Sequence, residues 1–252
     1  MSNLYWLSDD EWSRIEPLLP RGRRGAHRVD DHRVISGIVH MLRSGARWRD
    51  CPPEYGPYTT IYNRFNRWSR QGIWYEIFEA LTGTTGMIGT VAVDSSYIKA
   101  HRSAAGGKGG PPTKAIGRSR GGRTTKIHAL TDDQGRPRAL TLTPGNTGDV
   151  TVAPALFAAV GSFSRLLADT AYDANWLRDL LAEQGVEAII PCNPRRKPLI
   201  PHDALAYRQR NLIERMFGRI KDFRRIATRY DKLARNFLSA VLIAAIVIWW
   251  IN

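Results

Sequence analysis

Apolar residues recur at helical spacing in the first part of the chain. Ser8 and the acidic residues that follow it form a capping box. Gly45 and Gly72 each stop a run with helical periodicity. The pattern predicts three helices before residue 90, over about 9–19, 31–44 and 59–71.

From residue 90 the period changes to the alternation that is typical of strands. Three strands are expected first, followed by helix, strand, helix, strand and helix. The strands are predicted over about 90–98, 125–132, 138–144, 164–169 and 186–191, and the helices over 149–160, 175–184 and 204–226. This order indicates an α/β fold, a ribonuclease H-like mixed sheet with flanking helices, preceded by a small all-helical N-terminal domain.

Two domains follow from this change of period. Residues 1–89 are expected to form a helical, helix-turn-helix-like domain, and residues 90–252 the domain that contains the mixed sheet. Between the first two strands, residues 99–124 combine glycines and basic residues without an acidic one, which predicts a flexible loop at the sheet edge. The third helix carries basic residues that would face a DNA groove, or would simply form the solvated face of an amphipathic helix: Arg64, Arg67 and Arg70.

The net charge of +14 and a pI near 10.3 favour a polyanionic partner, because Lys and Arg that neutralise phosphates release counterions. Charge alone does not separate DNA, RNA and an anionic membrane. The apolar run over residues 240–251 is short against the roughly 20 residues of a bilayer span, so a buried C-terminal helix is expected rather than a membrane anchor. Two distant cysteines suit a reducing cytosol, and we expect a cytoplasmic, nucleoid-associated protein.

Two carboxylates end up close together in the predicted sheet. Asp94 lies inside the apolar strand VAVDSSYI, where a charge is costly unless it is paired or binds a cation. Asp169 ends the strand SRLLAD. These strands are neighbours in a ribonuclease H-like sheet, so the side chains of Asp94 and Asp169 are expected to converge.

A third carboxylate, Glu214, lies on the long helix 204–226. At 100° per residue it shares one stripe with Tyr207, Arg210 and Lys221, while the apolar residues of the helix face the other way. An exposed i, i+4 charge network has the same spacing. Carboxylates from two strands and a helix form an oxygen ligand set suited to Mg²⁺ or Mn²⁺, and two such ions support in-line displacement at phosphorus. Asp94, Asp169 and Glu214 are therefore the predicted catalytic and metal-binding residues.

The spacing Tyr207-x2-Arg210-x3-Glu214-x6-Lys221 resembles the Y-(2)-R-(3)-E-(6)-K signature of IS4-type DDE transposases. The segments VAVDSSYIKAHRSAAG, TPGNTGDV and LADTAYDANWLRDLL, with the opening LSDDEWSRIEPLLP, are similar to the IS5 family of bacterial insertion-sequence transposases. The resemblance covers nearly the whole chain. It implies that Asp94, Asp169 and Glu214 are the catalytic triad, and that the N-terminal region recognises terminal inverted repeats.

The resemblance also makes Asn146 a candidate active-site neighbour, although Asn146 and Asp149 most simply form a turn and a helix cap. Tyr207, Arg210 and Lys221 are predicted to support the site or bind phosphate. In the basic loop, further DNA contacts are predicted for Arg118, Arg120 and Arg123. The expected partner is double-stranded DNA, both transposon ends and target, bound by a homodimer or higher homo-oligomer.

Two other functions stay open at this point. One is a catalytically silent DNA-binding regulator, against which the three carboxylates argue. The other is a ribonuclease H-like nuclease that hydrolyses DNA without strand transfer.

Overall fold

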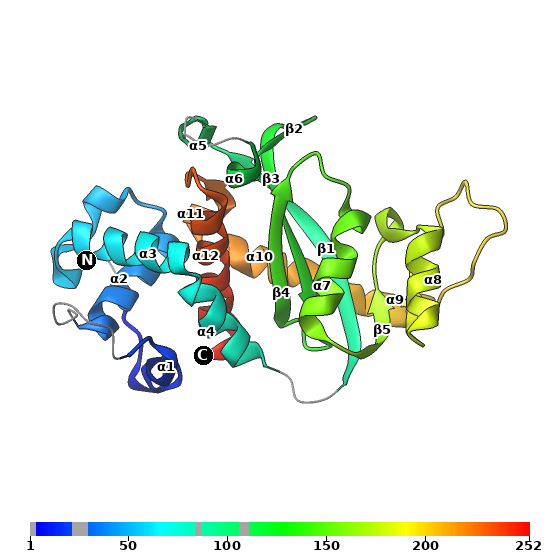
Figure 1. Cartoon of the computed structure of the whole chain (residues 1–252), viewed down its shortest axis with the longest axis horizontal. Helices are drawn as coiled ribbons and strands as arrows, with labels where there is room; N and C mark the ends of the chain where they lie inside the picture. Colours follow the sequence, from blue (N-terminus) through cyan, green and yellow to red (C-terminus); the bar gives the residue numbers. More distant parts are fainter. Residues whose placement is uncertain (1–3, 22–29, 84–86, 106–110) are drawn as a thin grey trace. The chain divides into compact units, whose positions relative to one another are not determined.

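The computed structural model describes residues 4–21, 30–83, 87–105 and 111–252. The chain forms two compact units, each built from separate stretches of sequence (Figure 1). The helical unit comprises Met1–Gly83, Lys99–Lys114 and Arg219–Asn252. The sheet unit comprises Thr84–Ile98 and Ala115–Gly218. The chain therefore crosses between units several times, whereas a single boundary near residue 89 was predicted.

The helical unit begins with two capped helices. In α1 (Asp9–Ile15), Ser8 accepts from the Glu11 amide and the Glu11 side chain accepts from the Ser8 amide, which confirms the predicted capping box. A 3₁₀ turn, η1 (Glu16–Leu18), follows. In α2 (Asp31–Ser44), Asp30 caps the start, and Gly45 ends the helix at φ 71°, where a side chain would be strained.

Two further helices meet at a single glycine. The 3₁₀ turns η2 (Trp48–Asp50) and η3 (Pro53–Tyr55) lead to α3 (Tyr58–Gln71). Gly72 ends α3 in the left-handed conformation and is also the N-cap of α4 (Ile73–Thr82). No helix was predicted over 73–82, where the structure has α4.

The C-terminal helix α12 (Ala234–Ala245), extended by the π-helical turn η7 (Ile246–Trp250), is buried as predicted. Its partners are α2, α3 and α4 of the helical unit, although the sequence placed this helix within the domain of residues 90–252. None of the helices in the described ranges is long and apolar enough to cross a membrane.

The sheet unit contains the five predicted strands, and β2 in addition. They are β1 (Ile88–Ala100), β2 (Gly117–Ser119), β3 (Gly122–Thr131), β4 (Pro137–Pro144), β5 (Phe163–Leu167) and β6 (Glu187–Ile189). The order is β2-β3-β1-β5-β6, with β4 also on β3. β3 and β4 are antiparallel, while β5 runs parallel to β1 and β6. The last residues of β1 pair with β7 (Thr228–Arg229) inside the helical unit.

An apolar core fills one face of this sheet. Val91 and Val93 of β1 pack there with Leu166 of β5, under the 3₁₀ turn η4 (Asp149–Val152), α7 (Ala153–Val160) and α8 (Asn175–Glu183). Figure 1 shows α7 in front of the strands and α10 passing behind them. Strand alternation then turns Ala92 and Asp94 toward the other face. This is a mixed α/β sheet with flanking helices.

Two predicted elements are interrupted. The segment 99–124 was predicted to be a flexible loop, but it contains the end of β1, α5 (Arg102–Ala105), α6 (Pro111–Lys114) and β2; its residues 106–110 lie outside the described ranges. The long helix predicted over 204–226 is four pieces: α9 (Ala204–Tyr207), the 3₁₀ turn η6 (Arg208–Arg210), α10 (Asn211–Lys221) and α11 (Arg224–Ala227). Apolar periodicity continued across these breaks and so concealed them.

Candidate active site

Asp94 and Asp169 both lie just beyond the stretch in which the neighbouring parallel strands β1 and β5 pair. The register of β1 and β5 pairs Ala92 with Leu167, and each aspartate follows two residues later. The predicted adjacency of these strands is therefore confirmed. Asp169 is also the N-cap of the 3₁₀ turn η5 (Thr170–Tyr172), where one carboxylate oxygen accepts from the Ala171 amide at 2.9 Å.

Arg210 joins Asp94 to Glu214. Its guanidinium donates to Asp94 Oδ2 at 2.6 Å and to Glu214 Oε1 at 2.6 Å. The Asp94 and Arg210 side chains are only 15% and 14% exposed, whereas Glu214 is 58% exposed. Two of the predicted carboxylates, from a strand and a helix far apart in the sequence, therefore converge on one cation.

Burial makes the Asp94 carboxyl easier to protonate than an exposed aspartate. Burial raises its pKa, and Arg210 and the Ser95 amide lower it. The negative charges of Asp169 and Glu214 raise it again, and the result is about 6. Burial is the largest of these contributions. Three carboxylates near one arginine also leave net negative charge, so the site favours additional positive charge.

The carboxylates need side-chain movement before they can hold a metal ion. Within the described residues, no three His, Cys, Asp or Glu side chains lie close enough to hold one as they stand. Arg210 takes an oxygen of Asp94 and one of Glu214, and a backbone amide takes one of Asp169. The donor chemistry nevertheless fits Mg²⁺ or Mn²⁺, since all three groups offer oxygen and the site already stabilises a cation.

The supporting residues predicted from the helix stripe lie in different surroundings. Tyr207 packs edge-on against His202, with ring centroids 5.6 Å apart, and burial raises its pKa. Lys221 is in the last turn of α10, in the part that belongs to the helical unit. Asn146 lies against β2, where a Cβ at Gly117 would collide with its amide. No hydrogen bond links Asn146 to the three carboxylates among the described residues, and its role as an active-site neighbour stays a prediction.

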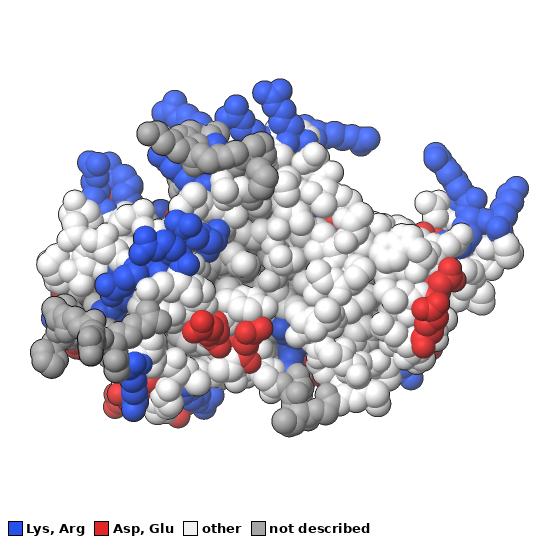
Figure 2. Space-filling view, viewed as in Figure 1, with Lys and Arg blue, Asp and Glu red and all other residues white. Residues whose placement is uncertain are grey.

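The predicted DNA-contacting arginines divide into buried and exposed groups. Arg64 is only 5% exposed, forms an ion pair with Asp31 and stacks over Trp68, so its prediction as a DNA contact is wrong for this conformation. Arg67 and Arg70 are exposed on α3. The exposed arginines of the β2–β3 hairpin are Arg118, Arg120 and Arg123. Figure 2 shows basic side chains projecting where Figure 1 draws β2, and others gathered over α3.

Two polar groups near the carboxylates were not predicted. The Tyr172 hydroxyl is buried and without a hydrogen-bond partner among the described residues; burial and the charges of Asp149, Asp94 and Asp169 raise its pKa. Lys126 is buried on β3 and pairs with Asp149 at 2.8 Å. Lys126 and His128 interrupt the otherwise apolar run of TKIHALTD, a pattern from which buried polar roles are predictable.

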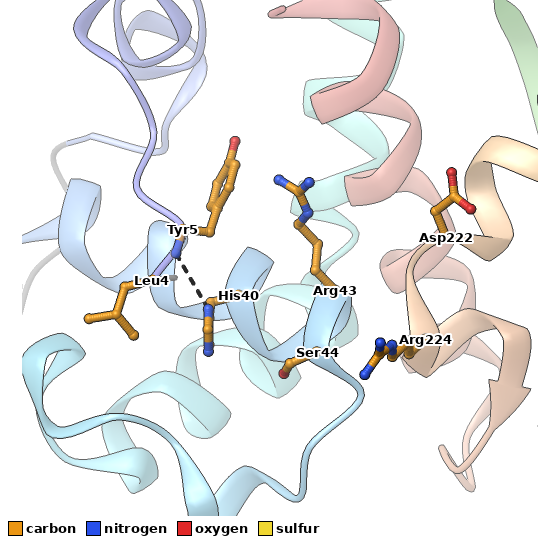
Figure 3. Close-up of a pocket in the computed structure, with 7 residues that line it drawn as sticks. All are labelled: Leu4, Tyr5, His40, Arg43, Ser44, Asp222 and Arg224. Carbon is orange, nitrogen blue, oxygen red and sulfur yellow. Dashed lines mark hydrogen bonds between the residues drawn. The ribbon is translucent and has the colours of Figure 1, made fainter. Parts of the chain in front are cut away.

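A separate pocket of about 340 Å³ lies in the helical unit (Figure 3). The Arg43 guanidinium lies 4.9 Å from the centre of the Tyr5 ring, and the Tyr5 amide donates to His40 Nδ1 at 3.4 Å. Its one carboxylate is Asp222, and none of the predicted site residues line it. A single carboxylate beside Arg43 and Arg224 does not suit a divalent metal, so the pocket is not the catalytic centre.

Known proteins resemble the chain along most of its length. The family model described as "Putative transposase of IS4/5 family" matches residues 7–78, and the model "Transposase DDE domain" matches residues 85–250. A Brucella ovis protein, "Putative transposase for insertion sequence element IS6501", is 37% identical over 127 residues, which are 50% of this chain and 98% of the relative. A Burkholderia cepacia protein, "Insertion element IS402 uncharacterized 16.2 kDa protein", is 36% identical over 107 residues, covering 37% of this chain and 73% of the relative.

The fold has a counterpart among solved structures. The piggyBac transposase in a synaptic complex with hairpin DNA aligns with a TM-score of 0.52 at 11% identity, over 96% of this chain and 72% of that one. This likeness supports the ribonuclease H-like architecture. Because the DDE model covers well over half of the sequence, and the resemblance of the motifs agrees with it, the chain belongs to the DDE transposase family of insertion sequences.

Proposed function

We propose that Asp94, Asp169 and Glu214 are the metal ligands with which this transposase cuts DNA at the ends of an insertion sequence and joins them to a target. The observation that carries the proposal is the convergence of Asp94 and Glu214 on Arg210, with Asp169 at the end of the adjacent strand. The family implies divalent metal use. Two Mg²⁺ or Mn²⁺ ions, when bound, would activate the attacking oxygen and stabilise the leaving oxygen at phosphorus.

Arg210 also has a proposed role in binding a DNA phosphate. Metal binding requires Arg210 to release Asp94 or Glu214, because its guanidinium takes oxygens from both. The released guanidinium is suited to pair with a DNA phosphate, which it can bind in a bidentate manner. DNA and metal would then favour each other, because a phosphate that draws Arg210 away frees the carboxylates.

The ends of the element would be recognised by the helical unit. On α3 the outward face presents Thr59, Asn63, Arg67 and Arg70, and the helix contains no acidic residue. Arg and Asn side chains on such a face can donate to base edges in the major groove. The fragment 1–89 alone would expose the apolar surfaces that α12 covers, so end recognition is best tested in the full chain. The exposed arginines of the β2–β3 hairpin would add phosphate contacts.

We infer that two copies act together, since an insertion sequence has two ends to cut and join. The substrate would be double-stranded DNA of the bacterial nucleoid, in the cytoplasm. The +14 charge supports this, because phosphate contacts dominate affinity for duplex DNA.

The test is incubation of the full chain with DNA that carries its own element's ends and Mg²⁺, followed by mapping of the cut and joined strands. Asp94→Ala, Asp169→Ala and Glu214→Ala should each lower cleavage by at least about 100-fold, because losing a ligand misplaces the reacting oxygens. End binding should stay near wild type. Asp179→Ala, on the exposed side of α8, is the matched control and should cut normally.

The same assay separates the alternatives. A pre-cleaved end with a 3′-hydroxyl should join to target DNA in the presence of the wild type. Hydrolysis without joining would indicate a nuclease, and binding with neither reaction would indicate a silent regulator. A correctly folded alanine variant that cut and joined at the wild-type rate would remove that residue from the ligand set.

A further inference from the structure

A second charged cluster lies behind the strand that carries Asp94. Alternation along β1 turns Ser95 to the face opposite Asp94, toward β3 and the start of η4. There Ser95 meets residues that are mostly buried. We call this group the Lys126 cluster, and its members are Ser95, Lys126, His128 and Asp149.

Lys126 is the cation of this cluster. Its side chain is only 4% exposed, and a buried ammonium group is costly unless its donors are satisfied. Its Nζ donates to Asp149 Oδ1 at 2.8 Å and to the Thr147 carbonyl at 2.8 Å, and it lies 4.7 Å from the centre of the Tyr97 ring. Burial lowers the pKa of Lys126, but hydrogen bonds to Asp149 and Tyr97 outweigh it and raise the pKa. The ammonium group is therefore charged and fixed in position.

Asp149 joins the cluster to β1. Its Oδ1 accepts from the Ser95 hydroxyl at 2.6 Å as well as from Lys126. His128 Nδ1 is 3.7 Å away and has no hydrogen-bond partner among the described residues. Burial lowers the pKa of His128 to about 4, so this imidazole is neutral near pH 7. Lys126 therefore supplies the positive charge that balances Asp149.

Ser95 connects the Lys126 cluster to Asp94 through two hydrogen bonds. Its backbone amide donates to Asp94 Oδ1 at 2.7 Å, while its hydroxyl is held by Asp149. The parallel partners of β1 stop at Ala92 and resume at Lys99, so in the described part of the chain the stretch with Asp94 has no parallel neighbour. The hydrogen bond from Ser95 to Asp149 therefore holds β1 in a stretch that has no parallel partner strand.

We propose that Ser95, Lys126 and Asp149 are positioning residues that set the carboxylate of Asp94 for metal binding from the opposite face of β1. The inference rests on the proposed function, because it assigns Asp94 to a metal ion. Hydrogen-bonded neighbours that orient metal ligands change metal affinity or activity by roughly 10- to 100-fold when they are removed. The cluster is expected to act within that range.

The experiment measures Mn²⁺ affinity of the full chain by titration calorimetry and electron paramagnetic resonance, without DNA. Ser95→Ala removes the hydroxyl bond to Asp149 and should weaken Mn²⁺ binding roughly 10- to 100-fold. Ser95→Thr keeps the hydroxyl and should restore affinity to near wild type. Ser164→Ala is the matched control, since that serine donates to the Gly89 carbonyl outside the cluster.

A second variant separates positioning from stability. Lys126→Met/Asp149→Leu removes both charges together, so that neither is left buried and unpaired. It should keep a thermal midpoint near wild type and weaken Mn²⁺ binding as Ser95→Ala does. If Ser95 acts by positioning, Ser95→Ala should weaken Mn²⁺ binding while Ser95→Thr does not, and both variants should unfold near the wild-type temperature. A loss of Mn²⁺ affinity caused by destabilisation would instead be accompanied by a lower thermal midpoint.

Asp94→Asn is the reference for the proposed function. If Asp94→Asn loses Mn²⁺ affinity while Ser95→Ala and the double variant bind like wild type, the positioning role is overturned and the metal role of Asp94 stands. If Asp94→Asn itself binds Mn²⁺ like wild type, Asp94 is not a ligand, and the positioning role fails with it.

Discussion

Two aspartates of the sheet unit, Asp94 and Asp173, are both paired with arginine, and yet their pKa values are shifted in opposite directions. Asp173 is fully buried and accepts from Arg178 at 2.8 Å and Arg196 at 2.9 Å, and from the Asn193 amide at 2.7 Å. Burial raises its pKa, but these hydrogen bonds outweigh burial and lower it to about 2. The pKa of Asp94 is raised to about 6 instead.

The difference lies in how far the partners offset burial, which is the largest single contribution at both residues. Asp173 has two arginines to itself, so its negative charge is fully paired and the segment around it is held by both ion pairs. Asp94 shares Arg210 with Glu214 and lies near Asp169. A carboxylate that is fully paired with arginine stabilises the fold. A group of carboxylates that shares one arginine leaves negative charge that a metal ion can neutralise.

The largest expected effect comes from removing the shared cation. Arg210→Gln should lower cleavage by at least about 100-fold, because it removes a phosphate partner and disturbs the geometry of the reacting groups. It should also raise Mn²⁺ affinity without DNA by about tenfold, since the competitor for Asp94 and Glu214 is gone. Single-turnover cleavage and metal titration measure the two effects.

Arg208→Gln is the matched control, because Arg208 is exposed on the same 3₁₀ turn and is expected to change neither quantity. Unchanged or weaker metal binding in Arg210→Gln would contradict the idea that Arg210 and metal compete.

Asp173, which pairs with two arginines, should affect stability rather than catalysis. Asp173→Asn should lower the free energy of unfolding at pH 7 by about 2 kcal/mol, from a pKa that falls to about 2 in the folded chain. Denaturant titration measures this. Asp179→Asn, exposed on α8, should have no effect of that size.

The sign of the pH dependence follows from the lowered pKa. The contribution of Asp173 is fully present above its unfolded pKa, near 4, and is lost as the pH falls toward about 2. The difference in unfolding free energy between wild type and Asp173→Asn should therefore shrink over that interval. A difference that stayed constant down to pH 2 would show that the charge of Asp173 is not what stabilises the loop.

A smaller effect is expected from the exposed arginines of the β2–β3 hairpin. Replacing Arg118, Arg120 and Arg123 together with Ala should flatten the dependence of log affinity on log salt by about 0.9 for each DNA phosphate that the variant no longer neutralises. Titrations with duplex DNA at several salt concentrations measure the slope. An unchanged slope would exclude the hairpin from the DNA interface.

The smallest effect separates two arginines of one helix. Arg67→Ala should reduce the salt slope by about 0.9 without changing stability, because its side chain is exposed. Arg64→Ala should destabilise the helical unit and leave the slope alone, because it would remove the buried ion pair between Arg64 and Asp31. The reverse pattern would restore Arg64 as a DNA contact.

The sequence predicted what depends on periodicity and strand order. Asp94 and Asp169 follow apolar strands whose pairing is a general property of the fold, so their proximity was predictable. The burial of Arg64 was not, because it depends on Asp31 of another helix. Arg210 reaches Asp94 across 116 positions, a contact that no local pattern encodes. Gly72 misled the prediction because one left-handed residue ends α3 and also starts α4.

The packing of α12 on α2, α3 and α4 makes the two units complete at different moments of protein synthesis. The sheet unit ends at Gly218, so the stretch that carries all three carboxylates has left the ribosome before residues 219–252. The helical unit waits for those last residues, although its first helix is made at the start. A nascent or prematurely terminated chain would hold Asp94, Asp169 and Glu214 without the finished helical unit.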